Sequence, residues 1–185
     1  MSTYSIGQMN QLGDALETAG FTPGEVTKLQ QFRGLATLRA VLNGTAQIVV
    51  TKHVIDCDAD PFVPENWKVE EHQKGGKFEW DPSQIELYLD KGQLGGNSIV
   101  GNKLRQKMSS KKIMNACVLD FLLAHPELIP EEWKSRAVFF WGTIYRESDG
   151  NLYVRYLCWD GGGWSCYYGW LVSGFNDDCP AALRK

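Results

Sequence analysis

The residues best suited to metal chemistry are three aspartates at alternate positions, Asp56, Asp58 and Asp60. This spacing lets carboxylates turn toward one cation, as the first ligands of a calcium-binding loop do. The remainder of that loop pattern is missing, because Pro61 stands where the sharp turn needs glycine and Trp67 where a bidentate glutamate belongs. A solvated acidic loop is therefore the favoured interpretation of these residues.

Histidine supplies the other ligand type that a divalent metal would need. Together with His72, the aspartates Asp56, Asp58 and Asp60 would form a metal site of a hydrolase or nuclease, and we keep this as an alternative function. No serine stands in a Gly-x-Ser-x-Gly turn, and the three histidines lie in no recognisable triad context. The sequence thus identifies no catalytic residue and no cofactor, and it favours a protein that is not an enzyme.

More than half of the aromatic residues lie between Phe139 and Phe175, where hydrophobicity alternates with a period of two. A protein or ligand could be recognised there by aromatic anchors with arginine partners. The candidate anchors are Trp159, Trp164, Tyr167 and Trp170, with Arg146 and Arg155 as the charged partners. The competing interpretation is that helices cover both faces of the sheet and that most of these rings are core.

Alternation along the middle strand predicts which side chains share a face. Leu152, Val154, Tyr156 and Cys158 form the more uniformly apolar set, so we expect them to face the core. Tyr153, Arg155 and Trp159 then belong to the outer face. This places an arginine and a tryptophan side by side at the proposed recognition surface.

Charge is distributed unevenly along the middle of the chain. No acidic residue lies between Asp90 and Asp120, while the preceding segment from Asp56 is rich in acids. The basic side chains of interest are Lys103, Arg105, Lys107, Lys111 and Lys112. They either pair with the acidic segment inside the fold or attract a phosphate-bearing or acidic partner. The net charge of -3 argues against nucleic acid as the general partner.

Composition places the protein in the cytoplasm. The cysteine count is odd, with Cys57, Cys117, Cys158, Cys166 and Cys179 too scattered for a zinc site or a disulfide framework, so we expect reduced thiols. Cys158 and Cys166 flank a hairpin turn and are predicted to lie close across it. No run is long enough to span a membrane, and no signal pattern begins the chain.

The element pattern predicts an α/β (α+β) fold in a single domain of residues 1–185. Residues 1–44 read as a cap of short helices, with a capping box at Thr22 and Glu25. Residues 45–135 read as mixed α/β, opening with a strand from Ala46 to Ile55, and we expect a mixed or antiparallel sheet. Residues 136–185 read as an aromatic-rich, three-stranded antiparallel meander with glycine turns.

Three strings resemble a known family: Phe139 to Arg146, Trp159 to Trp164, and Leu122 to Lys134. The family consists of small hypothetical proteins from uncultivated and candidate-phylum bacteria. The resemblance covers roughly residues 45–181 and implies a bacterial or phage-borne origin, with no activity to carry over.

From these patterns we expect a non-enzymatic binding module that recognises a protein or a small phosphate-bearing ligand through the meander. The metal-dependent hydrolase or nuclease is one alternative. A homo-oligomeric structural or assembly protein, associating through the aromatic face, is the other.

Overall fold

The computed structural model describes residues 3–32, 34–49 and 51–185. Contacts divide the chain into two compact units, Met1–Thr51 and Lys52–Lys185, and each is described by itself. Strands from before and after residue 135 pair in one sheet of the second unit. The single domain of residues 1–185 stays a prediction.

The first unit contains α1 (Ile6–Thr18), α2 (Pro23–Leu29) and α3 (Leu35–Leu42), as the helical spacing predicts. The Thr22 hydroxyl accepts from the Glu25 N–H and the Glu25 carboxylate accepts from the Thr22 N–H, which confirms the capping box. None of the described residues in these three helices is buried.

The strand expected from Ala46 to Ile55 is largely wrong. Only its end forms a strand, β1 (Val54–Asp56), while residues 46–49 have no regular structure and Val50 lies outside the described residues. Ile48 and Val49 are highly exposed. Strand propensity reflects packing against neighbours, and these described residues have no strand beside them.

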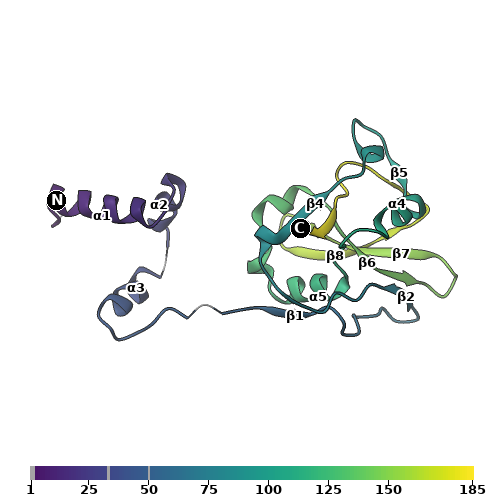
Figure 1. The fold of residues 1–185 in the computed structure, drawn as a ribbon, viewed down its shortest axis with the longest axis horizontal. Helices are drawn as coiled ribbons and strands as arrows, with labels where there is room; N and C mark the ends of the chain where they lie inside the picture. Colours follow the sequence, from purple (N-terminus) through teal and green to yellow (C-terminus); the bar gives the residue numbers. More distant parts are fainter. Residues whose placement is uncertain (1–2, 33, 50) are drawn as a thin grey trace. The chain divides into compact units, whose positions relative to one another are not determined.

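The second unit is built on a six-stranded sheet with β2 off its main path (Figure 1). The main order is β4 (Ile85–Tyr88), β10 (Ala181–Arg184), β6 (Val138–Arg146), β7 (Leu152–Trp159) and β8 (Trp164–Trp170). β10 runs parallel to β6, and the other pairs are antiparallel. The mixed sheet and the three-stranded meander β6–β7–β8 are therefore confirmed.

β6 has two neighbours along the edge that faces away from β7. β10 pairs with it at Phe139, and β2 (Lys68–His72) pairs with it from Thr143 to Arg146. Gly142 lies between these two pairings, where its N–H donates to the Met114 carbonyl. A Cβ on Gly142 would come within 2.9 Å of Asn115, so only glycine permits this approach.

Two small sheets and two helices complete the unit. β1 pairs with β3 (Lys77–Glu79), and β5 (Ile99–Val100) pairs with β9 (Gly174–Phe175). The helices are α4 (Gly101–Met108) and α5 (Ala116–Ala124). Short 3-10 turns span Pro82–Gln84, Lys91–Gln93, Pro126–Leu128 and Glu131–Ser135. None of the helices described is long and apolar enough to cross a membrane.

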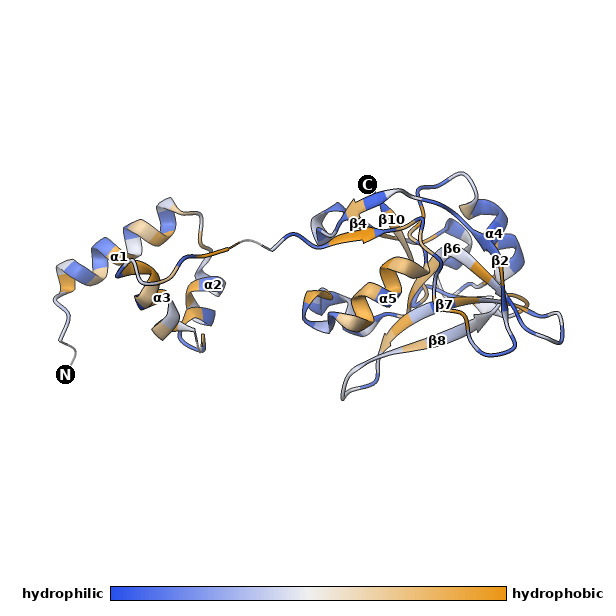
Figure 2. Cartoon of the chain, turned by 90° about the horizontal axis from the view of Figure 1, so that it is seen from below, coloured by the Kyte–Doolittle hydropathy of each residue, from blue (hydrophilic) through white to orange (hydrophobic). Residues whose placement is uncertain are grey.

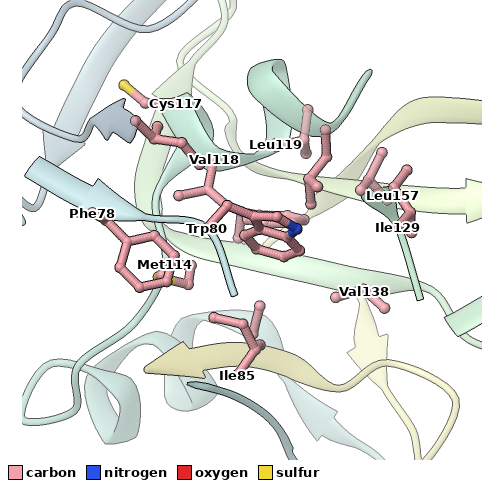
Figure 3. Close-up of a cluster of buried hydrophobic side chains, with 14 of the residues drawn as sticks. Phe78, Trp80, Ile85, Met114, Cys117, Val118, Leu119, Ile129, Val138 and Leu157 are labelled. Atoms are coloured by element: carbon pink, nitrogen blue, oxygen red, sulfur yellow. The ribbon is translucent and has the colours of Figure 1, made fainter. Parts of the chain in front are cut away.

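The central strand β6 is buried on both faces of the sheet. On the α5 face, Phe140 and Leu157 pack with Trp80 and the helix α5. Figure 2 shows α5 beside the sheet, and Figure 3 shows Leu157 and Trp80 with Val118 and Leu119 of α5. On the α4 face, Phe139 and Val154 pack with α4 and Phe175. Eight consecutive residues of β6 are buried, and all of them except Gly142 and Thr143 have large apolar or aromatic side chains.

Candidate binding surfaces

The predicted aromatic anchors are not gathered into one patch. Trp159 and Trp164 lie opposite each other on the α5 face with ring centroids 5.6 Å apart. Trp170 is on the same face at the other end of β8, opposite Tyr153. Tyr167 lies on the α4 face, with its ring 5.7 Å from that of Tyr156.

These rings are exposed to different degrees. Trp159 and Trp164 are half-buried, and the Lys134 ammonium lies 4.2 Å from the Trp159 ring centroid. Tyr167 and Trp170 are 44% and 42% exposed. The exposed aromatic surface is therefore at the Tyr167 to Trp170 end of β8.

Arg155 was predicted on the outer face, and this is wrong, because its side chain is buried at 3% exposure. Its Nη1 lies 2.7 Å from Oδ1 of Asp120 on α5. The two groups form an ion pair, but the geometry at Nη1 does not meet the criteria for a hydrogen bond. Its Nε donates to Cys166 Sγ at 3.3 Å, and the Phe62 ring lies beside the guanidinium. A helix and a loop thus cover the face that alternation left open.

The Arg146 side chain is also held by hydrogen bonds within the protein. Its guanidinium donates to both carboxylate oxygens of Glu70, at 2.7 and 2.6 Å, and to the Gly150 carbonyl at 2.8 Å. Hydrogen bonds from Arg146 lower the pKa of Glu70. This bidentate pair joins β2 to β6. The pair of N–H groups that would bind a partner's carboxylate is therefore already occupied by Glu70.

The residues proposed for a metal site are used in structural hydrogen bonds. His72 Nδ1 lies 2.9 Å from the Thr143 hydroxyl, which accepts from the Ala116 N–H. Nε2 lies 3.1 Å from the Cys57 carbonyl oxygen and 3.4 Å from Asn115 Nδ2. Both ring nitrogens therefore face partners within the fold, which leaves neither of them directed toward a metal.

The three aspartates do not converge on His72. Asp56 accepts from the Asp58 N–H, and Asp58 accepts from the Gly76 N–H. Among the described residues, no group of three or more potential ligands is placed to hold a metal ion. The geometry gives the metal-dependent alternative no support.

The basic segment pairs in part with the acidic segment, as one of the two interpretations expected. Arg105 forms an ion pair with Glu71, and Lys107 lies 2.7 Å from Asp90. The Lys111 ammonium lies 4.0 Å from the Tyr88 ring centroid. Lys103 and Lys112 form no ion pair with any described residue.

Two adjoining hollows lie beside this segment. The larger, of about 840 Å³, is called the polar cleft, and the smaller, of about 120 Å³, is called the basic pocket. They share Gln73 and Ile113. The polar cleft includes Glu71, Asn102, Arg105, Gln106 and Ser109, and the basic pocket includes Lys74, Lys112 and Arg184.

Sequence analysis missed the contribution of Lys74 and Arg184. They come from the loop after β2 and from β10, and Lys112 comes from the link between α4 and α5. No spacing rule joins three segments so far apart in the chain. These three residues could have been grouped only if the position of β10 in the sheet had been known.

The cysteines are free thiols, and burial disfavours the thiolate at several of them. Burial raises the pKa of Cys117 to about 11, and burial also raises the pKa of Cys57 and of Cys166. Cys166 is opposite Leu157, and Cys158 is opposite Ser165, so the two side chains of the second hairpin are on opposite faces of the sheet. All five cysteines are free.

β8 is the outer strand of the meander, and among the described residues it pairs only with β7. The Leu171 N–H, just beyond β8, donates to the Leu152 carbonyl at 2.9 Å. Hydrogen-bonded and open pairs alternate along an antiparallel ladder, so this bond fixes the pattern for the whole strand. Trp164, Cys166 and Tyr168 therefore direct their backbone N–H and C=O groups away from β7.

Comparison with known proteins finds no family model, no curated protein and no solved structure that matches the chain. The resemblance to the bacterial family stays a prediction. Function is therefore argued from the surfaces described above.

Proposed function

We propose that Lys52–Lys185 is a binding module that takes up an extended segment of a partner protein as an additional strand beside β8. The observation that carries this proposal is the chemistry of the edge. β8 reads Trp-Ser-Cys-Tyr-Tyr-Gly-Trp, without a charge or a proline. Proteins usually protect sheet edges with lysine, proline, a bulge or a covering element, because an open edge invites another strand.

Strand addition uses the backbone groups that β8 directs outward. Hydrogen bonds between main chains would supply affinity, and alternate side chains would supply selectivity. On the α5 face the incoming strand meets Tyr168 and Trp170, which are 38% and 42% exposed. Trp67 packs beside Tyr168, with ring centroids 5.0 Å apart.

The α4 face presents a different neighbour to the same strand. There Tyr167 is 44% exposed and lies beside Gly169, which has no side chain. A partner segment that is uncharged, with β-branched or aromatic residues on both faces, matches this edge. The proposal keeps the aromatic meander as the recognition element and moves the contact from its face to its edge.

The test removes one outward N–H without disturbing the pairing with β7. Tyr168→Pro deletes that donor, and Tyr168→Ala removes the same ring while keeping it. The probe is a fluorescent, end-capped peptide of alternating threonine and valine, titrated by anisotropy against the full chain. We expect Tyr168→Pro to weaken binding about tenfold more than Tyr168→Ala, because it loses a hydrogen bond and introduces a steric block.

Two results would contradict the proposal. Equal binding by the two variants, with circular dichroism showing both folded, would exclude strand addition at this edge. A wild-type chain that is a dimer by light scattering, and a Tyr168→Pro variant that is a monomer, would identify a second copy as the occupant. That result would support the homo-oligomeric alternative in place of a separate partner.

A further inference from the structure

The lining of the basic pocket carries positive charge, although Asp56 and Asp58 lie close enough to act on its Cys57. Lys74, Lys112 and Arg184 line it, and no carboxylate is among its lining residues. None of the three forms an ion pair with a described residue, whereas the neighbouring Arg105 and Lys107 do. All three side chains are exposed, so water screens their mutual repulsion, and an anion between them would reduce it further.

Backbone hydrogen bonds hold the main chain of two of these residues, Lys112 and Arg184, next to each other. The Arg184 N–H donates to the Lys112 carbonyl at 2.8 Å, next to the antiparallel bridge between Ile113 and Leu183. The Arg184 guanidinium lies 5.1 Å from the Phe78 ring centroid. Both cations are therefore held on a paired backbone, which limits the entropy lost when a ligand orders them.

The third cation belongs to a loop that is tied to the sheet. Next to Lys74, the Gln73 N–H donates to the Gly142 carbonyl at 2.7 Å. The Gly76 N–H donates to Asp58 Oδ1 at 2.9 Å, which engages the nearby carboxylate with the backbone. Lys74 thus starts from a loop with hydrogen bonds on both sides.

The floor of the pocket is buried and already satisfied. Asn115, 2% exposed, donates to the Cys57 carbonyl at 2.7 Å and to the Gln73 carbonyl at 3.0 Å. Burial raises the pKa of the Cys57 thiol, so this side chain is neutral and does not repel an anion. The ligand's charge would be met by the three cations, against the nearby carboxylates of Asp56 and Asp58.

We propose that the basic pocket binds the phosphate group of a small phosphomonoester, whose uncharged part lies in the polar cleft. Its volume of about 120 Å³ suits a single phosphate group rather than a larger anion. Gln73 lines both hollows, so one ligand can reach from the first into the second. Asn102, Gln106 and Ser109 offer amide and hydroxyl groups that hydrogen-bond a polar body such as a nucleoside.

Calorimetry tests this site on the full chain with adenosine monophosphate, inorganic phosphate and adenosine as separate probes. We expect the monophosphate to bind more tightly than inorganic phosphate, and adenosine to show no saturable binding. Lys112→Gln and Arg184→Gln should each weaken the monophosphate about tenfold or more, through loss of a charge-assisted bond. Lys103→Gln removes the same charge from α4 outside the pocket and should leave affinity unchanged.

Two outcomes would overturn the inference. One is the absence of saturable binding by either phosphate probe, and the other is an equal loss of affinity in Lys103→Gln and Lys112→Gln. Inorganic phosphate that binds as tightly as the monophosphate would refute the role of the polar cleft. This site is separate from β8, so Tyr168→Pro should not change any of these affinities.

Discussion

The contact between Arg155 and Asp120 gives the sharpest test of how the meander is held together. Asp120→Asn keeps the shape of the side chain and its ability to accept from the Phe62 N–H, which now donates to Oδ2 at 3.1 Å. It removes the negative charge and places an amide NH2 where Oδ1 now faces Arg155 Nη1. The Arg155 guanidinium, 3% exposed, is then a buried cation without its counter-ion.

The expected loss can be worked out from the surroundings of the pair. Removing one partner of a fully buried ion pair costs about 3–5 kcal/mol. Asp120 is 28% exposed, so water screens part of the interaction, and the rings of Phe62 and Tyr145 continue to favour the cation. We therefore expect Asp120→Asn to lower the free energy of unfolding by about 2–3 kcal/mol.

Urea denaturation followed by tryptophan fluorescence measures this loss. All seven tryptophans belong to Lys52–Lys185, so the signal reports that unit alone. Asp178→Asn is the matched control, because the same change is made in an exposed pair with Arg136 and should cost less than about 1 kcal/mol. In the Arg155→Met background, Asp120→Asn should cost much less. If Asp120→Asn costs no more than Asp178→Asn, the buried pair is not what fixes Arg155.

Three further outcomes follow from the described contacts. Gly142→Ala should lower the free energy of unfolding by about 2 kcal/mol or more in the same urea assay, since its Cβ would come within 2.9 Å of Asn115. Burial raises the pKa of Cys117 to about 11, above the ordinary thiol value, which gives stability that is complete below about pH 9 and is lost as pH rises toward 11. Melting temperature should therefore fall over that range, and less so in Cys117→Ala. A chelator should leave the melting temperature unchanged, because His72 uses both ring nitrogens in hydrogen bonds, and a drop of several degrees would reinstate the metal site.

Local patterns in the sequence predicted the local elements well. The capping box at Thr22, the turn from Asp160 to Gly163 and the three strands of the meander all depend on residues within a few positions of one another. Such features depend on backbone geometry and on hydrogen bonds between residues close together in the chain, so a single sequence is enough to predict them.

Features that depend on distant segments could not be predicted in this way. Alternation correctly placed Arg155 and Val154 on opposite faces, but it could not show that Asp120 and Phe62 would cover the arginine. The basic pocket forms because β10 lies beside the segment that precedes α5. Hydrophobic periodicity does not predict that these two segments are neighbours. Residues 46 to 49 show the reverse case, in which a local pattern predicted a strand that does not form. Their strand propensity is strong, but no strand lies beside them among the described residues.

The position of β10 also bears on the order in which the chain can fold during synthesis. Its residues, Ala181–Arg184, are translated after those of every other strand, yet they lie between β4 and β6. A nascent chain that has reached Phe175 lacks the strand that joins these two, and Ala182 and Leu183 are missing from the cores on either face. The sheet can close only once Arg184 has left the ribosome, so chaperones would meet this unit with both cores still open.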